Sequence, residues 1–462
     1  MSLSRTVLQE LVEIVGADWV LEAPEDILCY AYDGTFSEGR PDVAVLPGRV
    51  EEVAAVLRVA QREGISVIPR GMGSGLAAAS VPFEGGIVLT LTRLNRILEI
   101  DPIDMVAVAE AGVITGDLQA AVEARGLFYP PDPSSLKHCT LGGNVACNAG
   151  GPRCLKYGVT RDYVLALQVA LADGRVLRVG SRTAKNATGY SLVQLFISAE
   201  GTLGVVTEVT LRLLPLPRAV RTVLATFPRL ADASEAVTAV LQAGIRPATL
   251  ELMDETAIRC VEDFLHLGLP LDVEAILLIE CDGDESQVAG EVQAVAALCE
   301  QRGAALVRTA SAKTDRDDLW RARRAISGSL SRMRPNKLGE DIVVPRHAIP
   351  AMVARLKEIS RTCALPIVIF GHAGDGNLHP NLLFDRRDPE EWQRVQQATE
   401  AIFEAAVELG GTLSGEHGVG MLKRPYLPLA VDPVAIELMR GIKQTLDPQG
   451  ILNPGKVVGN DG

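Results

Sequence analysis

Several features are missing from this sequence of 462 residues, and each absence excludes a class of protein. Its eight cysteines include no C-x-x-C pair, which disfavours zinc ribbons and iron–sulfur clusters held by this chain. A chain of this length needs no disulfide framework, so the cysteines are predicted to be reduced and to serve as small core residues. Positive charge is in deficit, and the net charge of −13 argues against a nucleic-acid partner.

Long hydrophobic runs are absent as well. No uncharged apolar stretch approaches the ~20 residues that span a bilayer. Near the N-terminus, Glu10 and Glu13 interrupt the apolar region that a secretory signal would need, and an amphipathic helix is predicted there. We therefore expect a cytoplasmic protein, which would be peripheral at a membrane only through a partner.

The first third of the chain contains apolar patterns that predict strands alternating with helices. Residues 50–60 repeat with helical spacing and Gly64 offers a cap, after which residues 65–68 are predicted to be a buried strand. Another helix is predicted to begin at Thr115 and to end near Gly126. Short apolar runs lie between them at residues 87–91, 98–100 and 106–109. This alternation indicates α/β layering.

Residues 129–161 follow neither a strand nor a helix period, because prolines and then glycines dominate them. A stretch of about 30 structureless residues is uncommon inside a compact domain unless a ligand or a function holds it. Regular patterns resume at residues 163–172, where Ala172-Asp173-Gly174-Arg175 predicts a hairpin turn.

Leu214-Pro215-Leu216-Pro217 is the best candidate for a domain boundary. Beyond it the pattern becomes that of an α+β layout with a split β-α-β unit. The predicted order is strand 222–227, helix 231–243, strand 248–253, strand 275–281, helix 286–302 and strand 305–309.

Two glycine-rich segments in the first part of the chain suit a long dinucleotide. Residues 69–75 follow a strand directly, and their glycines let backbone N–H groups approach a phosphate while Ser74 adds a hydroxyl. The G-x-G-x-G spacing is neither a Rossmann fingerprint nor a Walker loop. Residues 141–151 are predicted to be a second glycine-rich loop.

Two further glycine-rich turns, at residues 371–379 and 414–418, hold three of the six histidines. Two imidazoles and a carboxylate on such turns are a ligand set for a divalent transition metal with open positions. His417 beside the carboxylate suits an acid/base role. Ordinary turn histidines are the competing interpretation, and it becomes less favoured when both turns are considered together. Residues 367–370, before the first turn, are predicted to be a strand.

Taken in order, these segments resemble one family. P-R-G-x-G-S-G at 69–75, P-P-D-P-S-S at 130–135, L-G-G-N-x-A-x-N-A-G-G at 141–151 and G-T-L-G-V-V-T at 201–207 resemble the FAD-binding (PCMH-type) domain of the vanillyl-alcohol oxidase superfamily. With H-A-G-D-G-N-L-H, S-G-E-H-G and L-N-P-G-K, they resemble the branch of FAD-linked D-2-hydroxy acid dehydrogenases. That branch holds the flavin subunit of glycolate oxidase and the D-lactate and D-2-hydroxyglutarate dehydrogenases. The likeness covers about residues 20–457.

The resemblance implies an α+β fold in three parts. A two-subdomain PCMH-type FAD-binding domain is expected at residues 1–217, with its core at about 38–217. An α+β substrate (cap) domain with an antiparallel sheet is expected at 218–410. A C-terminal segment, 411–462, is expected to return to the flavin site and to complete the active site.

The resemblance also implies which residues bind FAD. Non-covalent binding is favoured, because the first glycine loop holds no histidine and His138, just before the second, is a poor covalent anchor. The expected cofactor-binding residues are Arg70, Gly71, Gly73, Ser74, Gly75, Pro131, Ser135, Gly142, Asn144, Asn148, Gly150, Gly204, Val206 and Asn453.

For the reaction, the resemblance assigns His372, His379 and Glu416 to a divalent metal, with zinc preferred over iron or manganese. It assigns His417 to proton transfer from the substrate hydroxyl, while hydride passes from Cα to flavin N5. Arg323, in a Leu-Trp-x-x-Arg motif, is expected to bind the substrate carboxylate, and Lys337 is a second candidate. The other basic residues of 316–334 are expected to form a solvated helix face or a docking patch.

The predicted function is FAD-dependent oxidation of a D-2-hydroxy acid, glycolate or D-lactate, with electrons passed to a partner. The partner would be an iron–sulfur subunit, electron-transfer flavoprotein, a cytochrome or a quinone, and a homodimer or a hetero-complex is open. One alternative is another superfamily enzyme, such as an alkyl-dihydroxyacetone-phosphate synthase or an aldose oxidase, which the histidine and glutamate set disfavours. The other is a non-catalytic FAD-binding electron-transfer subunit, which would need neither metal ligands nor Arg323.

Overall fold

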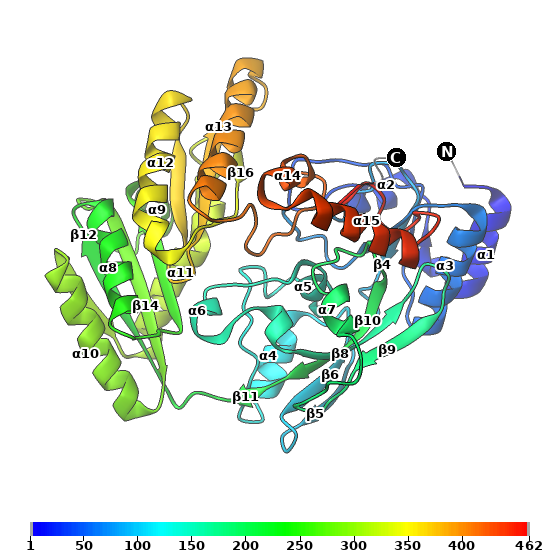
Figure 1. The fold of residues 1–462 in the computed structure, drawn as a ribbon, viewed down its shortest axis with the longest axis horizontal. Coiled ribbons are helices and arrows are strands. Elements are labelled where there is room, and N and C mark those ends of the chain that lie inside the picture. Colours follow the sequence, from blue (N-terminus) through cyan, green and yellow to red (C-terminus); the bar gives the residue numbers. More distant parts are fainter. Residues whose placement is uncertain (1–2, 460–462) are drawn as a thin grey trace. The chain divides into compact units, whose positions relative to one another are not determined.

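The computed structural model describes residues 3–459, which form two compact units (Figure 1). The first unit comprises the residues up to Gly150, Val159–Leu216 and the residues from Glu416 on. The second comprises Gly151–Gly158 and Pro217–Gly415. Along the chain, the second unit is therefore inserted into the first.

A small sheet opens the first unit, with strand order β1-β2-β4-β3. Strand β4 pairs in parallel with β2 and with β3, which agrees with the predicted α/β layering. Helix α3 joins β2 to β3, buries one apolar side and ends at its cap Gly64, as predicted. The elements are α1 (Arg5–Val15), β1 (Val20–Leu21), α2 (Pro24–Ile27), β2 (Val43–Val45), α3 (Val50–Glu63), β3 (Val67–Arg70) and β4 (Ile87–Thr90).

A second sheet of the first unit is antiparallel, with strand order β5-β6-β10-β8-β9. The predicted hairpin is present as β8 and β9, and helix α4 begins at Thr115 as predicted. The elements are β5 (Ile97–Asp101), β6 (Val106–Glu110), α4 (Thr115–Glu123), β7 (Leu127–Phe128), β8 (Val164–Ala170), β9 (Val176–Gly180), α7 (Leu192–Phe196), β10 (Val205–Arg212), β11 (Leu214–Pro215), α14 (Leu427–Ala430) and α15 (Pro433–Leu446).

Residues 129–161 are more regular than predicted. Helices α5 (Leu141–Cys147) and α6 (Cys154–Tyr157) interrupt them, so the prediction of one structureless stretch is wrong. The two glycines of α5 have no side chains that could show a helical period in the sequence. The helix is nevertheless capped: Oγ1 of Thr140 accepts a hydrogen bond from the N–H of Gly143 at 3.2 Å.

One large antiparallel sheet organises the second unit, as predicted for this α+β half. Its strand order is β15-β12-β14-β13-β18-β19-β16, and β17 also pairs with β19. Every strand predicted beyond residue 217 is present. The strands are β12 (Ala219–Phe227), β13 (Thr249–Asp254), β14 (Ala275–Gly283), β15 (Leu306–Ala310), β16 (Asn336–Gly339), β17 (Ile342–Val343), β18 (Ile367–His372) and β19 (Asn377–Phe384).

Helices cover this sheet on both faces, since β14 is buried at every residue from Ala275 to Asp282. On one face α9 and α11 share a core with the strands through Met253, Ile258, Leu278 and Leu319. Helix α9 was not predicted. The helices are α8 (Leu230–Gln242), α9 (Glu255–Leu265), α10 (Glu285–Gln301), α11 (Lys313–Leu330), α12 (Ile349–Thr362) and α13 (Pro389–Glu408).

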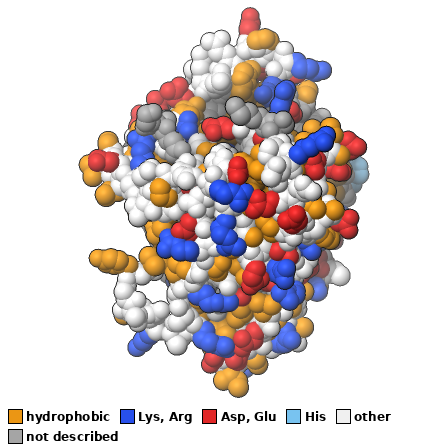
Figure 2. All heavy atoms as spheres, turned by 90° about the vertical axis from the view of Figure 1, so that its right-hand side faces the viewer, with side chains coloured by type: hydrophobic (Ala, Val, Ile, Leu, Met, Phe, Trp, Pro, Cys, Tyr) orange, Lys and Arg blue, Asp and Glu red, His pale blue; other side chains and the backbone are white. Residues whose placement is uncertain are grey.

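The surface carries both signs of charge. Figure 2 shows one face of the molecule, on which acidic and basic side chains are interspersed rather than gathered by sign. Among residues 3–459, no helix is both long and apolar enough to cross a membrane. All eight cysteines are free thiols, and Cys139, Cys260, Cys281 and Cys299 are buried as small core residues.

Candidate active site

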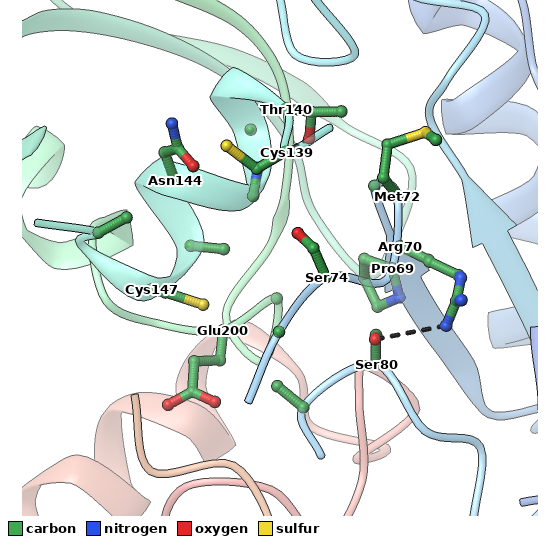
Figure 3. A pocket seen from close by; sticks show the side chains of 18 of the residues that line it. Pro69, Arg70, Met72, Ser74, Ser80, Cys139, Thr140, Asn144, Cys147 and Glu200 are labelled. Carbon is green, nitrogen blue, oxygen red and sulfur yellow. Dashed lines mark hydrogen bonds between the residues drawn. The ribbon is translucent and has the colours of Figure 1, made fainter. Parts of the chain in front are cut away.

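The first unit contains a cavity walled by segments that lie far apart in the sequence (Figure 3). The loop after β3, residues 133–135, helix α5 and residues 200–206 all contribute to the wall. The lining includes many of the residues predicted to bind FAD, namely Arg70, Gly71, Gly73, Ser74, Gly75, Ser135, Gly142, Asn144, Gly204 and Val206.

The loop after β3 approaches α5 closely at Gly71. A Cβ atom at Gly71 would lie 2.4 Å from Oγ1 of Thr140, so a side chain does not fit there unless the loop moves. Figure 3 shows Ser74 pointing into the space between this loop and α5. The backbone of the loop therefore borders the cavity directly, as a phosphate-binding loop requires.

The second glycine-rich segment meets the cavity as a helix and not as the predicted loop. Gly142, Gly143 and Ala146 of α5 line the cavity, so small residues form part of its wall. The Asn144 side chain, predicted to contact the flavin, donates from Nδ2 to Oγ1 of Thr115 at 2.6 Å. This hydrogen bond fixes α5 to the rest of the unit.

Four residues predicted to bind the cofactor do not line the cavity: Pro131, Asn148, Gly150 and Asn453. The carbonyl of Pro131 accepts a hydrogen bond from a glutamine of α4 at 2.8 Å. Asn148 ends α5 with a φ of 53°. The amide of Asn453 donates to the carbonyl of Ala79 at 2.9 Å, just behind the wall.

Arg70 lines the cavity, but its guanidinium also contacts the chain around it. It donates to the carbonyl of Tyr32 at 2.7 Å and to the hydroxyl of Ser80 at 3.4 Å, the latter shown dashed in Figure 3. Burial lowers the pKa of Arg70, while Asp33 opposes this shift. These contacts fix the end of β3, where the glycine loop begins.

Glu200 is a cavity residue that the sequence interpretation missed (Figure 3). Its side chain is buried, and its carboxylate accepts the N–H groups of Val419 at 2.7 Å and Gly420 at 2.9 Å. Burial raises the pKa of Glu200 to about 7, although both hydrogen bonds lower it. Its place directly before the G-T-L-G-V-V-T motif is the signal that could have indicated it.

Glu416 and His417 also line this cavity, from the C-terminal part of the first unit. One was predicted to bind a metal and the other to transfer a proton. Both therefore border the predicted flavin site, more than 200 residues along the chain from the other wall segments.

In the second unit, His372 and His379 come together across a β-hairpin. His372 ends β18 and His379 lies on β19, opposite Phe370 in the strand register. The two imidazole rings are 5.1 Å apart between centroids and nearly perpendicular, and both side chains are buried. The pairing of β18 with β19 brings the two side chains together.

Glu251 of β13 joins His372 to Arg323 in a buried network that sequence reasoning missed. Its Oε1 lies 2.6 Å from Nδ1 of His372, and its Oε2 accepts from the guanidinium of Arg323 at 2.7 Å. Burial alone would raise the pKa of Glu251, but the charges of its two partners hold it below the ordinary value. Arg323, predicted to bind a substrate carboxylate, thus contacts a carboxylate of the protein.

Asp341, fully buried, is a second acidic residue that was missed. Its carboxylate accepts from the amide of Asn377 at 2.8 Å and from the N–H of Gly415 at 2.9 Å. Nδ1 of His379 lies 3.8 Å from Oδ1 of Asp341. Asp341 thus places a carboxylate beside a predicted histidine ligand and fixes the residue that precedes Glu416 in the chain.

Lys337, the second candidate for the substrate carboxylate, lies on β16 opposite Leu383 of β19. Its side chain is partly buried, and Nζ donates to the hydroxyl of Ser327. Burial lowers the pKa of Lys337. Both candidates for the substrate carboxylate, Arg323 and Lys337, belong to the second unit.

Comparison with known proteins accounts for both parts of the chain. A model of FAD binding domains matches residues 41–180, and a model of the C-terminal domain of FAD linked oxidases matches residues 216–457. The chain is 42% identical to glycolate oxidase subunit GlcD of Bacillus subtilis, over 99% of this chain and 98% of the relative. It is 38% identical to D-lactate dehydrogenase of Archaeoglobus fulgidus, over 90% of this chain and 91% of that protein.

The fold agrees with these matches. The structure of p-cresol methylhydroxylase with bound substrate superimposes with a TM-score of 0.82 at 19% identity, over 98% of this chain and 96% of the other. The expected α+β architecture, with an FAD-binding part and an antiparallel C-terminal part, is therefore confirmed. The chain belongs to the FAD-linked oxidases and is an FAD-linked oxidoreductase of the PCMH, or vanillyl-alcohol oxidase, superfamily.

Proposed function

We propose that this FAD-linked oxidoreductase oxidises a D-2-hydroxy acid, glycolate or D-lactate, to the corresponding 2-oxo acid. The observation that supports it most is the buried network of His372, Glu251 and Arg323, with the second imidazole of His379 beside it. Full-length relatives named glycolate oxidase subunit and D-lactate dehydrogenase support the substrate class.

FAD, when bound, supplies a hydride acceptor at N5 of its ring. The cavity of the first unit suits a dinucleotide of this kind, because the glycine loop borders it directly and α5 contributes small residues to its wall. We propose non-covalent binding by the predicted residues that line this cavity. Pro131, Asn148, Gly150 and Asn453 would then support the wall from behind.

A divalent metal, zinc before iron or manganese, is proposed to be held by His372, His379 and Glu416, with Asp341 as a further oxygen donor. Such a metal would act as a Lewis acid on the substrate's hydroxyl and carboxylate. Imidazole nitrogens and carboxylate oxygens are donors that suit this ion. Nδ1 of His372 lies 2.6 Å from Glu251, which leaves the lone pair of Nε2 for coordination, the usual effect of a carboxylate behind a histidine ligand.

The remaining roles fall to charged side chains. His417 is proposed to accept the proton of the substrate hydroxyl, since it lines the cavity beside Glu416. Arg323 and Lys337 are proposed to face the substrate carboxylate. Arg323 would serve twice, because it also neutralises Glu251.

The electrons of the reduced flavin must then leave the protein. The subunit relatives support a redox partner, which we propose to be an iron–sulfur subunit, electron-transfer flavoprotein, a cytochrome or a quinone. A cytoplasmic location, peripheral at a membrane through such a partner, is part of this proposal. So is a functional division into residues 1–217, 218–410 and 411–462.

The test is to record the visible spectrum of the purified protein and to add glycolate, D-lactate, L-lactate and D-2-hydroxyglutarate one at a time without oxygen. Bleaching of the flavin band by glycolate or a D-acid, abolished by a chelator, would support the proposal and identify the substrate. A yellow protein that none of these acids bleaches would favour the electron-transfer subunit instead. A colourless protein that takes up no FAD would contradict the cofactor assignment.

Replacing His372 or Glu416 by alanine further distinguishes an enzyme that oxidises the acid from an electron-transfer subunit. An oxidising enzyme should keep its FAD but lose bleaching by the acid, whereas an electron carrier would transfer electrons as before. His347→Ala is the matched control, because His347 is exposed and lies outside the histidine pair.

A further inference from the structure

We propose that Glu200 is the positioning residue that holds the turn of Glu416 and His417 at the flavin cavity. The inference rests on the function proposed above, in which these two residues act on the substrate. It assigns a role to a buried carboxylate that the proposed chemistry does not otherwise use.

The first support is the pair of hydrogen bonds at the carboxylate. Both oxygens of Glu200 are engaged, Oε1 by the N–H of Val419 at 2.7 Å and Oε2 by the N–H of Gly420 at 2.9 Å. The two oxygens of one carboxyl group thus accept from two consecutive N–H groups of the turn. Val419 is two residues from His417, so these bonds limit where that imidazole can lie.

The second support is the close fit of the turn to this carboxylate. Gly418 has a φ of +85°, and a Cβ atom there would lie 2.8 Å from Oε1 of Glu200. A larger residue would push the carboxylate and the turn apart. Glycine therefore lets the turn approach Glu200 closely enough for its next two N–H groups to bond.

The third support is that two further side chains of the C-terminal part, Lys443 and Asn453, donate hydrogen bonds to residues 200–202. The amide of Asn453 donates to the carbonyl of Glu200 at 2.7 Å. Nζ of Lys443 donates to the carbonyl of Thr202 at 2.8 Å and to that of Leu452 at 2.7 Å. Residues 200–202 thus accept several hydrogen bonds from the C-terminal part of the chain. Among these, the bonds to the Glu200 carboxylate come from the residues nearest to His417.

The backbone of Glu200 agrees with a constrained role. Its φ is +49°, in the left-handed region that side chains other than glycine rarely adopt. Such conformations persist where the surroundings fix the residue, and they cluster at functional sites. The hydrogen bonds to its carboxylate and its carbonyl are contacts that can hold Glu200 in this conformation.

The test compares Glu200→Gln with the unchanged protein, both loaded with FAD. Glutamine has the same shape, but its NH₂ group cannot accept a hydrogen bond, so one of the two N–H groups loses its acceptor. Flavin reduction by the acid is followed without oxygen by stopped-flow, which gives the limiting rate and the half-saturating concentration. Hydrogen exchange of a peptide covering residues 416–424 is measured in the same samples without substrate.

We expect the E200Q protein to keep its FAD while the limiting rate falls about 10–100-fold, as for other groups that orient a site. The half-saturating concentration should change little, and the peptide should exchange faster. Glu110→Gln is the control, because Glu110 is equally buried in the same unit, is paired with Arg96 and does not line the cavity. It should leave all three quantities unchanged.

Glu200→Asp is the second variant, for the case that glutamine prevents folding. It keeps the charge, but its side chain is one methylene too short to reach both N–H groups, so the same loss of rate is expected. Wild-type rate and exchange in either variant would overturn the proposal. So would a loss confined to FAD content, with the rate per bound flavin unchanged.

The two proposals fail separately. If no 2-hydroxy acid bleaches the unchanged protein, the proposed function is wrong, and the exchange comparison, which needs no substrate, still decides whether Glu200 holds the turn.

Discussion

At the scale of single residues, Glu251 is a buried carboxylate that contacts both His372 and Arg323. It has no exposed surface, and its two oxygens face one imidazole and one guanidinium. Buried ion pairs contribute little net stability, but removing one partner leaves the other charge uncompensated. The network therefore makes the orientation of His372 depend on both of its neighbours.

Replacing Glu251 by glutamine should weaken metal binding about 10–100-fold while FAD stays bound. The neutral amide no longer holds Nδ1 of His372 as a charged acceptor does, and it leaves Arg323 without its counter-charge. Metal content after dialysis against a graded series of chelator concentrations measures the effect, and flavin absorbance gives the FAD content.

Glu280→Gln is the matched control for this variant. Glu280 is buried in the same sheet, but it accepts from the indole of Trp320 and the hydroxyl of Thr222, away from the histidine pair. Equal metal content in both variants and the unchanged protein would show that Glu251 does not orient a ligand.

A second prediction at this scale concerns pH and Asp254, the cap of α9. Burial raises the pKa of Asp254 to about 7, from 3.8, although hydrogen bonds from Ala257 and Ile369 lower it. Between these values the folded protein holds a proton that the unfolded chain has lost, so the free energy of unfolding falls as pH rises, by up to about 1.4 kcal/mol per unit. Above pH 7 this contribution is constant.

Asp254→Asn removes this titration, so the variant should gain on the unchanged protein as pH rises from 5 to 7 and then keep a fixed difference. Urea unfolding at pH 5, 6, 7 and 8 measures that difference. Parallel pH curves for the two proteins would show that Asp254 stays ionised when buried.

At the scale of helices and strands, local patterns were sufficient where apolar side chains mark a period. Helix α3 with its cap and the β8–β9 hairpin agree with the prediction. Helix α5 was missed because glycine supplies no pattern, and α9 because its cap and first turn continue directly from β13. The period is absent from the sequence only for α5, since Ile258, Val261 and Leu265 of α9 repeat with helical spacing.

The site shows the same division. Residues in short motifs, such as Ser74, His372 and His379, could be singled out from their spacing. Glu251 and Asp341 could not, because they reach the histidines only through strand pairing or chain segments distant in sequence. Long-range pairing of this kind leaves no local signal.

A test at this scale is Gly71→Ala in the loop after β3, at the point where that loop approaches Thr140, the cap of α5. The added methyl group would meet Thr140 at 2.4 Å, so the loop must move away from α5 and FAD affinity should fall at least about tenfold. Isothermal titration of the FAD-free protein measures it. Gly290→Ala in α10, where a Cβ has open space, should bind FAD normally and be slightly more stable. Equal affinity of the two variants would contradict the close approach.

At the scale of the whole molecule, the chain forms two compact units, each built from its own set of residues. The cavity proposed to bind FAD is lined by residues of the first unit, and the histidine pair lies in the second. Two units with their own cores can unfold in separate steps, so a single unfolding temperature need not describe this protein.

Calorimetry of the FAD-free protein should therefore show two transitions, of which added FAD moves one. At a free concentration 100-fold above its Kd, FAD adds about 2.7 kcal/mol to the unit that binds it, a shift of several degrees. Flavin fluorescence, followed through the same heating, should rise with that transition. If both transitions move equally, FAD binding and the second unit are coupled.

The insertion of the second unit has a consequence for biosynthesis. The glycine loop and α5 leave the ribosome early, but Glu416 and His417, which complete the cavity, follow roughly 270 residues after the end of α5. At about 5–20 residues per second, that interval lasts on the order of 13–54 s. During translation the incomplete pocket is therefore open to solvent and to chaperones until Glu416 and His417 have emerged.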